Sequence, residues 1–404
     1  MIIGRSFSLP WLKADYIVIN VVFFISVTLI GFITFNISVF DPIKKALSDF
    51  NFSDLLYSRL NSGIETLDTN VILVNIGYLD RTGIAGQIRI IRKQEPRVIG
   101  FDGFFSARKD SLADFRLKQQ LSDGKIVMAS YLTGKDELEA KFDVLEMSDP
   151  FFTSGATGYV NLGGSDRITS TVRYFSPSEN FQGATLEPLS VELVKRYNPE
   201  AYQRLKERRN AREHINYIGN RRAFICFDAT EIFDTSADLS IIRDKIVLMG
   251  YMGESLSDTA VEDIYFTPMN SQLSGRSIPD MYGVVIHANI VNMIVTRNYI
   301  NVMPEWLCIA LSFILCYFYI YFITLFNYKR PMLFNIIFPV LLLLLNVLII
   351  YFFFLLYKYF NYSINSGYFL APILLFKTFQ TYYERILLFL NRHIKINSVF
   401  MPKL

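Results

Sequence analysis

The chain has 404 residues, enough for one large or two ordinary domains, and 51% of them are hydrophobic. Its mean hydropathy of +0.28 is high for a wholly soluble protein. The formal net charge is +3, but residues 41–305 contain 30 Lys and Arg against 35 Asp and Glu. Because the excess positive charge lies towards the two ends of the chain, the composition gives no support to nucleic-acid binding.

Four apolar segments are predicted to cross a membrane as helices. Residues 16–40 contain no charged residue, and about 20 helical residues span a hydrocarbon core about 30 Å thick. A cleaved signal peptide is the alternative for this segment, but the apolar run is too long and no small-residue cleavage site precedes Asp41. The three other predicted spans cover residues 306–327, 332–357 and 363–383.

Basic residues predict the orientation of these spans. Those that flank the spans on one side of the membrane are Arg5, Lys13, Lys329, Arg330, Arg385, Arg392, Lys395 and Lys403. The short loop on the other side contains only Lys358. The positive-inside rule therefore places the N-terminal residues 1–15 and the tail 384–404 in the cytoplasm, and residues 41–305 outside it.

The outer region begins with a pattern of helices and buried strands. Residues 41–68 mix polar and apolar positions and are predicted to form one or two helices. Residues 71–76, VILVNI, form a continuous apolar run that is typical of a strand buried on both faces. Residues 83–95 place isoleucines at helical spacing, and residues 98–102 form a second apolar run. A strand, a helix and a strand in this order predict a parallel βαβ unit.

Further elements follow along the outer region. Additional strands are predicted at residues 126–131, 158–162, 214–218, 223–227 and 245–250, and additional helices at residues 111–122, 186–197, 200–212 and 283–297. Residues 132–155 and 251–282 show neither pattern and are predicted to be irregular. The predicted fold class is α/β: a single extracytoplasmic domain with a central, largely parallel sheet flanked by helices, plus four transmembrane helices, one N-terminal and three C-terminal.

Polar residues gather where the predicted parallel strands end. In open α/β sheets, ligands usually lie beyond these carboxyl ends. The candidate ligand-binding residues are Asn75, Tyr78, Asp80, Asp102, Glu254, Ser255 and Asp258. If strands 71–76, 98–102 and 245–250 are neighbours, the carboxylates share one cleft that suits a cationic or hydroxylated ligand, or a metal. The alternative is structural, because an aspartate after a strand commonly caps a helix or fixes a turn.

Catalytic motifs are absent from the sequence. It contains no G-x-S-x-G, H-E-x-x-H or Walker A pattern. Its three cysteines, Cys226, Cys308 and Cys316, form neither a disulfide framework nor a metal-binding spacing, and Cys226 is more typical of a strand residue than of a reactive thiol. We therefore predict no enzymatic activity, no cofactor and no metal centre. The spans lack acidic residues at depth, which argues against a pump or proton relay.

The segment 283–295, GVVIHANIVNMIV, contains a histidine in apolar surroundings. At 100° per residue, Asn289, Asn292 and Thr296 form one polar stripe, and His287 lies opposite it among apolar side chains. His287 is therefore expected to face the packed side of its helix. A core histidine hydrogen-bonded to a buried backbone or carboxylate group and a ligand contact are both compatible with that position.

Three stretches, in this order, resemble the CHASE type 2 domain, the second class of cyclase/histidine-kinase-associated sensory extracellular domains of bacteria. They are VILVNIGYLDRTGIAGQIRIIRKQEPRVIGFDGFF (71–105), RDKIVLMGYMGESLSD (243–258) and EDIYFTPMNSQ…IPDMYGVVIHANIVNMIV (262–295). The similarity covers roughly residues 41–305. One predicted span before the domain and three after it also resemble the membrane arrangement of that family.

The resemblance implies an extracytoplasmic sensory module of the bacterial inner membrane, normally joined to a cytoplasmic cyclase, kinase or phosphatase. The family positions present in this chain are Asp102, Asp258, Gly283, His287 and Ala288, which mark the fold and imply no binding role. Two features depart from the family pattern. Gly77 stands where many members have aspartate, and only about 20 residues follow the last predicted span, so a fused effector is not expected.

The expected function is that of a membrane-anchored sensor or interaction subunit whose outer domain binds an unknown small ligand or partner protein. Helix 283–297, followed by Pro304 and Trp306, is the expected link through the transmembrane helices to a separate membrane or cytoplasmic effector. The lipid bilayer and a second copy of the chain, in a homodimer, are the other expected partners.

Two other functions are compatible with the sequence. One is a structural docking subunit of a bacterial envelope complex, in which the outer domain is a platform for a partner. The other is a hydrolase built on Asp102, Glu254 and Asp258, although no recognisable nucleophile or metal triad accompanies these carboxylates.

Overall fold

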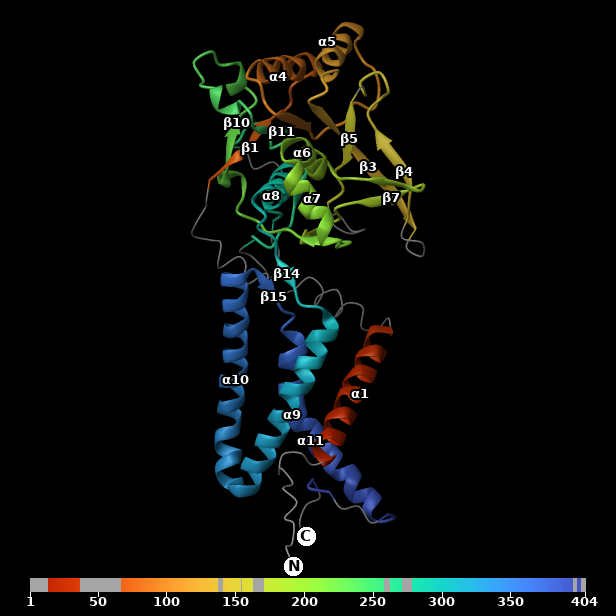
Figure 1. Cartoon of the computed structure of the whole chain (residues 1–404), viewed down its shortest axis with the longest axis vertical. Helices are drawn as coiled ribbons and strands as arrows, with labels where there is room; N and C mark the ends of the chain where they lie inside the picture. The colour runs from red at the N-terminus through yellow and green to blue at the C-terminus, as the bar shows by residue number, and fades with distance from the viewer. Residues whose placement is uncertain are drawn as a thin grey trace, which may run out of the picture. The chain divides into compact units, whose positions relative to one another are not determined.

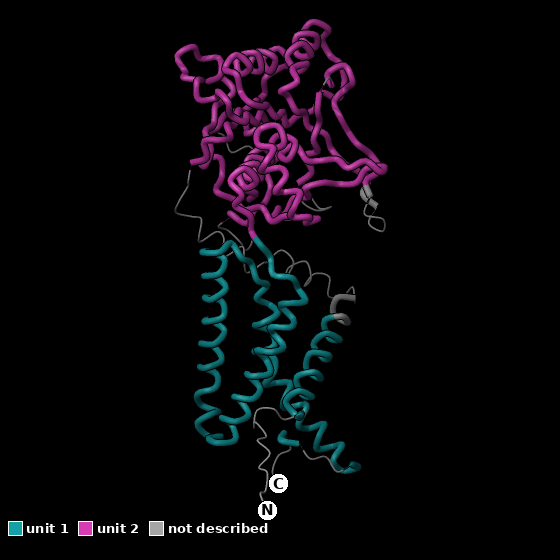
Figure 2. The backbone as a smooth tube through the Cα atoms, in the orientation of Figure 1, with its two compact units in different colours: residues 1–52, 301–404 teal, residues 53–300 magenta. Residues whose placement is uncertain are grey.

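The computed structural model describes residues 14–36, 67–136, 141–153, 155–162, 171–257, 262–270, 278–394 and 398–400. The chain divides into two compact units (Figure 2), one formed by residues 53–300 and the other by residues 1–52 and 301–404. The first, the α/β unit, contains the sheet, and the second, the helical unit, contains the long apolar helices. The helices predicted within residues 41–66 lie outside the described residues.

The α/β unit is built around a seven-stranded sheet with the strand order β10-β1-β11-β2-β3-β4, in which β5 also pairs with β3 (Figure 1). Its strands are β1 (Asp68–Asn75), β2 (Val98–Phe101), β3 (Ile126–Asp136), β4 (Lys141–Met147), β5 (Ala156–Tyr159), β10 (Phe224–Phe227) and β11 (Ile246–Gly250). Every pair is parallel except β3 and β4, which are antiparallel. The prediction of an α/β fold with a central, largely parallel sheet is confirmed.

Helices cover both faces of the sheet. They are α4 (Arg81–Lys93), α5 (Ser111–Leu121), α6 (Leu189–Tyr197), α7 (Pro199–Arg208) and α8 (Gly283–Thr296). Ile72 and Val74 pack in one core with Ile88 of α4, whereas a Cβ on Gly100 would lie 2.7 Å from Leu193 of α6. Because successive strand residues point to opposite faces, α4 and α5 lie on one face and α6 and α8 on the other, with α7 packed on α6 and α8 (Figure 1).

One stretch predicted to be irregular is part of the sheet. Within residues 132–155, β3 continues to Asp136 and β4 occupies Lys141–Met147. The prediction is wrong here because β4 is the last strand of the sheet. An edge strand contains polar residues beside exposed apolar ones, so it lacks the continuous apolar run of a buried strand. Val144 illustrates this, since it is 49% exposed.

Short antiparallel ladders and 3₁₀ turns complete the α/β unit. They are β6 (Tyr174–Phe175) with β9 (Glu213–His214), β7 (Glu179–Phe181) with β8 (Ala184–Leu186), β12 (Ile264–Tyr265) with β13 (Met281–Tyr282), and the turns η2 (Arg221–Ala223), η3 (Glu231–Phe233) and η4 (Ser240–Ile242). The strand predicted at residues 214–218 is wrong, because only Glu213 and His214 pair, outside the central sheet. The stretch 251–282, predicted to be irregular, contains the β12–β13 ladder.

Helix α8 is buried on all sides rather than on one face. Every residue from Gly283 to Ile294 is buried, including Asn289 and Asn292 of the predicted polar stripe, whereas Thr296 at the end of the stripe is exposed. The side-chain oxygen of Asn289 accepts a hydrogen bond from the backbone N–H of Ile218 (2.9 Å), and its amide donates to the carbonyl of Gly219 (3.0 Å). The stripe therefore faces a loop of the α/β unit, and its amide satisfies backbone groups that would otherwise be buried without partners.

In its described residues the helical unit contains four long helices, of which three can cross a membrane by length and composition. The helices are α1 (Ala14–Asn36), α9 (Glu305–Lys329), α10 (Pro331–Phe360) and α11 (Gly367–Asn391), and a short parallel ladder joins β14 (Asn301–Val302) to β15 (Tyr362–Ser363). The three candidate spans are α1, over Ala14–Gly31, α9 and α10. Helix α11 is not among them, because Lys377, Gln380 and Glu384 lower its hydropathy. The predicted count of four spans is therefore not confirmed.

The helices of the helical unit are held by apolar packing and by side-chain hydrogen bonds to the backbone of neighbouring helices. Phe23 of α1 packs with Ile320 of α9 and Phe376 of α11 in one cluster. The side-chain amide of Asn20 donates to the backbone carbonyl of Phe313 at 3.0 Å. Such a bond fixes the register of two helices, since an apolar surface offers the amide few other partners.

We expect replacement of Asn289 by alanine to lower the free energy of unfolding by about 2–3 kcal/mol, because it leaves two buried backbone groups without partners. Asn292→Ala on the same helix is the matched control, since no side-chain hydrogen bond of Asn292 is present in the described part of the chain. Chemical denaturation of the full chain in detergent measures both values. Equal losses would contradict the role given to Asn289.

Candidate functional site

The strands that carry the predicted ligand-binding residues are neighbours. β1 pairs with β11 and β11 with β2, all parallel, so that Asn75 lies opposite Gly250, and Met249 lies opposite Phe101. The ends of these three strands therefore form one side of the sheet, which we call the carboxyl edge. The prediction that the polar residues after these strands approach one another depended on this adjacency.

Asn75, at the end of β1, ties the loops of the carboxyl edge together. Its amide donates to a carboxylate oxygen of Asp228 and to the carbonyl of Gly253, both at 3.0 Å. Its side-chain oxygen accepts from the backbone N–H groups of Gly77 (3.0 Å) and Met252 (2.9 Å). These four bonds use the full capacity of the amide, so Asn75 positions the edge and has no capacity left for a ligand.

Asp228 is a residue of this edge that the sequence analysis missed. One carboxylate oxygen accepts from Asn75 and from the backbone N–H of Ala229 (2.7 Å), and the other accepts from the N–H of Leu256 (2.9 Å). Asp228 directly follows β10, which pairs with β1. The rule that polar residues follow parallel strands would have found it if residues 223–227 had been placed beside residues 71–76.

Asp80 has the structural role that was the alternative to ligand binding. It is the N-cap of α4, and its carboxylate accepts from the backbone N–H of Gly83 at 2.7 Å. The next residue, Arg81, pairs with Asp114 of α5 and donates to the carbonyl of Ala107 at 2.5 Å. These contacts anchor the start of α4 to α5 and account for both side chains without a ligand.

Tyr78 belongs to a row of tyrosine rings at the carboxyl edge. It is 66% exposed, and the hydroxyl of Tyr251 donates to its hydroxyl at 2.9 Å. The ring centroids of Tyr78 and Tyr251 are 5.6 Å apart, and those of Tyr251 and Tyr282 are 6.3 Å apart. Tyr78 is thus the exposed end of an aromatic row that reaches the residue before α8.

The loop after β11 brings two of its three predicted residues to the same edge. Glu254 is exposed, and its backbone carbonyl lies 3.1 Å from where a Cβ on Gly77 would be. The hydroxyl of Ser255 lies 2.8 Å from that of Ser257. Asp258 lies outside the described residues.

Asp102, at the end of β2, is the carboxylate of the edge with the most perturbed acidity. Loss of hydration on burial, and secondly the negative charge of Asp263, raise its pKa to about 7. Gly250 lies between it and α8: a Cβ there would be 2.8 Å from the Cβ of Val284 and 3.3 Å from that of Asp102. Asp263 is a second residue of this edge that the sequence pattern does not predict. A carboxylate oxygen of Asp263 lies 3.2 Å from where a Cβ on Gly283 would be.

The carboxylates of Asp102 and Asp263 therefore lie near the start of α8. The end of β11 also lies there, and its last residue, Gly250, contributes no side chain. The amino end of a helix carries a partial positive charge that favours nearby negative groups. Protonation of Asp102 removes one of the two negative charges from this arrangement.

His287, one turn further along α8, lies in the core. It is 2% exposed, and burial lowers its pKa to about 4, although a backbone hydrogen bond with Val160 acts in the opposite direction. Within the described residues its Nδ1 atom has no hydrogen-bond partner. The imidazole is therefore neutral at physiological pH. Its neighbour Ala288 is fully buried, and Gly283 begins the helix.

The other predicted coupling residues lie in the helical unit. Pro304 is the N-cap of α9, and its carbonyl accepts from the backbone N–H groups of Leu307 (3.0 Å) and Cys308 (3.1 Å). Trp306, in the first turn, is 69% exposed. The role of both residues in coupling stays a prediction.

The described residues contain no group of three or more His, Cys, Asp or Glu side chains that could hold a metal ion. Burial raises the pKa of the Cys226 thiol to about 12, and its sulfur contacts the carbonyl of Arg221 at 3.2 Å. A thiol in this state is a poor nucleophile.

The domain that contains the carboxyl edge matches a known protein family. The sequence model of the CHASE2 domain matches residues 38–322, well over half of the chain. The chain belongs to the CHASE2 domain family. CHASE2 domains are extracytoplasmic sensory domains, which confirms the resemblance inferred from the sequence motifs. No curated protein and no solved structure matches the chain.

Within this CHASE2 domain, the raised pKa of Asp102 makes the stability of the protein depend on pH in a predictable way. Its carboxyl has a pKa of about 7 in the native protein against an ordinary value of 3.8, so between these values the native state holds a proton that the unfolded state has lost. Its contribution to stability therefore falls as pH rises. We expect Asp102→Asn to match the wild type near pH 4 and to be more stable by up to about 4 kcal/mol near pH 8.

Thermal unfolding of the full chain in detergent across this pH range measures the difference. Glu207→Gln, which changes an exposed carboxylate on α7, is the control and should leave the profile unchanged. A constant difference between Asp102→Asn and the wild type at every pH would refute the assignment.

Proposed function

We propose that this CHASE2 protein is a membrane-anchored sensor or interaction subunit that binds a small ligand or partner at the carboxyl edge. In this proposal, binding at the edge changes the position of α8, and this change is transmitted to α9. The membrane helices then present a changed surface to a separate effector protein. Three observations support the proposal: the family membership, the three helices able to span a membrane, and the path of α8.

The path of α8 is the observation that carries the proposal. Its first residue, Gly283, lies at the carboxyl edge, and eight residues separate its last residue, Thr296, from Glu305, where α9 begins. Fourteen residues of α-helix extend about 20 Å. Because α8 is packed on all sides from Gly283 to Ile294, a displacement at its first residue moves this part of the helix as a body instead of being absorbed by solvent-exposed side chains.

A ligand changes the state of such a domain only by binding two conformations with different affinity. The contact between Gly250 and Val284 is suited to this, because the position of α8 relative to β11 decides how much space lies beside Asp102. A group bound there favours one position of α8.

Gly250→Ala tests the relay without a known ligand, because the added Cβ would lie 2.8 Å from the Cβ of Val284 and must displace α8. In a Cys226→Ser background the remaining cysteines, Cys308 and Cys316, both lie in α9. We expect Gly250→Ala to change their rate of reaction with maleimide about fivefold in nanodiscs, the size of a typical coupling.

The control is Gly124→Ala, whose Cβ would meet nothing within 4 Å and should leave the rate unchanged. Adding Val284→Ala to Gly250→Ala restores the space and should restore the rate, which separates a relay from general destabilisation. Equal rates for all folded variants would exclude the relay and favour the alternative, a docking subunit of an envelope complex.

The proposed orientation places both termini in the cytoplasm, which requires α11 to cross the membrane as a fourth span. A fluorescent protein fused after residue 404 is then expected to fluoresce in the cytoplasm, while alkaline phosphatase fused after residue 150 is active only outside it. A fusion in the short basic loop at Lys329 serves as the cytoplasmic control. A C-terminal fusion that is active only outside would leave three spans.

A further inference from the structure

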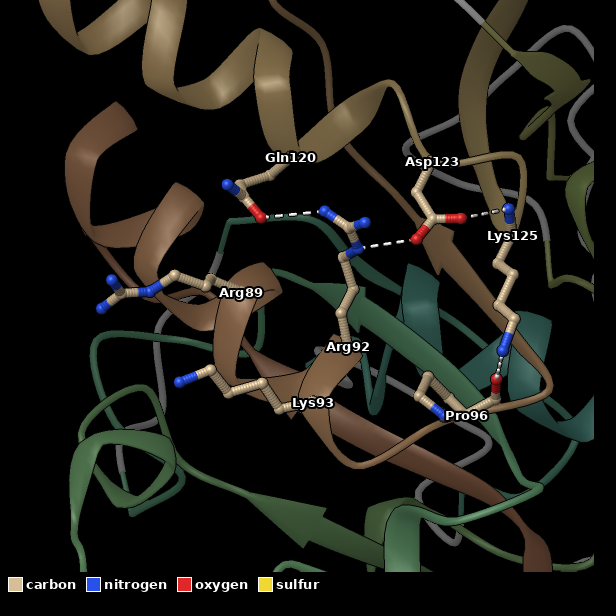
Figure 3. Close-up of a pocket in the computed structure, with 7 residues that line it drawn as sticks. All are labelled: Arg89, Arg92, Lys93, Pro96, Gln120, Asp123 and Lys125. Atoms are coloured by element: carbon tan, nitrogen blue, oxygen red, sulfur yellow. Dashed lines mark hydrogen bonds and ion pairs between the residues drawn. The ribbon is translucent and has the colours of Figure 1, made fainter.

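We propose that a basic pocket at the opposite, amino edge of the sheet binds small oxyanions of the phosphate type. The pocket has a volume of about 290 Å³, and its charged and polar lining consists of Arg89, Arg92, Lys93, Gln120, Asp123 and Lys125 (Figure 3). These residues come from the ends of α4 and α5 and from the start of β3. The pocket is therefore distinct from the carboxyl edge, where these strands finish.

The charges of the pocket do not balance. Four cationic side chains line it and only one carboxylate, that of Asp123. Helices α4 and α5 both end here, and each carboxyl end contributes about half a negative charge, which leaves about two positive charges uncompensated. Residues 41–305 as a whole contain more acidic than basic residues, so this pocket departs from the charge of its surroundings.

Part of the pocket is held in place by its own contacts. The Nε atom of Arg92 lies 2.7 Å from a carboxylate oxygen of Asp123, and its guanidinium donates to the side-chain oxygen of Gln120 at 3.0 Å. The ammonium group of Lys125 donates to the carbonyl of Pro96 at 3.1 Å. Figure 3 shows these bonds across the pocket. The two fixed cations form a wall whose position does not depend on a ligand.

Arg89 and Lys93 supply the uncompensated charge. Both are exposed, and neither has a hydrogen bond or ion pair within the described residues. They stand four residues apart on α4, where like charges repel, and they extend from the same side of the helix in Figure 3. A bound anion removes this repulsion, and it can accept bonds from both side chains at once.

The donor set indicates the class of ligand. A guanidinium group binds two oxygens of a phosphate or sulfate in its plane, and an ammonium group adds a compact positive charge. A cavity of about 290 Å³ suits a small group instead of an extended chain. Free inorganic phosphates and the phosphate of a lipid headgroup share this chemistry.

Titration calorimetry on the full chain in zwitterionic nanodiscs tests the proposal, with inorganic pyrophosphate and glycerol 3-phosphate as probes and chloride at constant ionic strength. We expect Arg89→Gln combined with Lys93→Gln to weaken binding of both probes about tenfold. Arg116→Gln, which changes an exposed arginine of α5 outside the pocket, should leave binding unchanged. Both pocket side chains are exposed, so the melting temperature without ligand should not change.

Each outcome decides a specific point. Tighter binding of pyrophosphate supports a free phosphate compound as the natural ligand, and tighter binding of glycerol 3-phosphate supports a lipid headgroup. The proposal is overturned if the wild type binds neither probe above the chloride control, or if Arg116→Gln weakens binding as much as the double variant does.

Discussion

The close approach of α8 to the end of β11 is the constraint on which the α/β unit depends. Gly250 has no side chain, and this absence lets Val284 pack against the strand with Asp102 beside it. A helix that is buried on all sides must also satisfy its own polar side chains, which Asn289 does by bonding to the loop at Ile218. The carboxyl edge, the core and the segment leading to α9 are therefore linked through one element.

The parts of the fold that sequence predicts are those whose signal is local. The central strands read as continuous apolar runs because helices cover both faces, as the fully buried residues Val71 and Val74 illustrate. The helices of the α/β unit are predictable from the helical spacing of their apolar residues. β4 was missed because an edge strand has no such run, and the short ladders were missed because two paired residues carry no pattern of their own.

The site is less predictable than the fold, because a polar residue after a strand has the same appearance whether the protein or a ligand satisfies it. Asn75 and Asp80 lie at the carboxyl edge, yet Asn75 bonds to Asp228 and to neighbouring loops, and Asp80 caps its own helix, α4. Asp228 and Asp263 come from segments distant in sequence. The pairing of β10 with β1 brings Asp228 to this edge, and the pairing of β12 with β13 brings Asp263 to the start of α8. Adjacency of strands, which a single sequence does not encode locally, therefore decides the membership of the site.

Asp102 differs from these structural residues in a way that bears on function. No side-chain hydrogen bond to its carboxylate is present within the described residues, and its burial disfavours the charged form. An asparagine would fill nearly the same volume without that cost, so stability alone does not account for an acid at this position. In the proposed function, a carboxyl group that titrates near neutral pH beside the start of α8 couples a local charge to the position of that helix. The proposed sensor requires such a coupling, whereas the alternative, a docking subunit, does not.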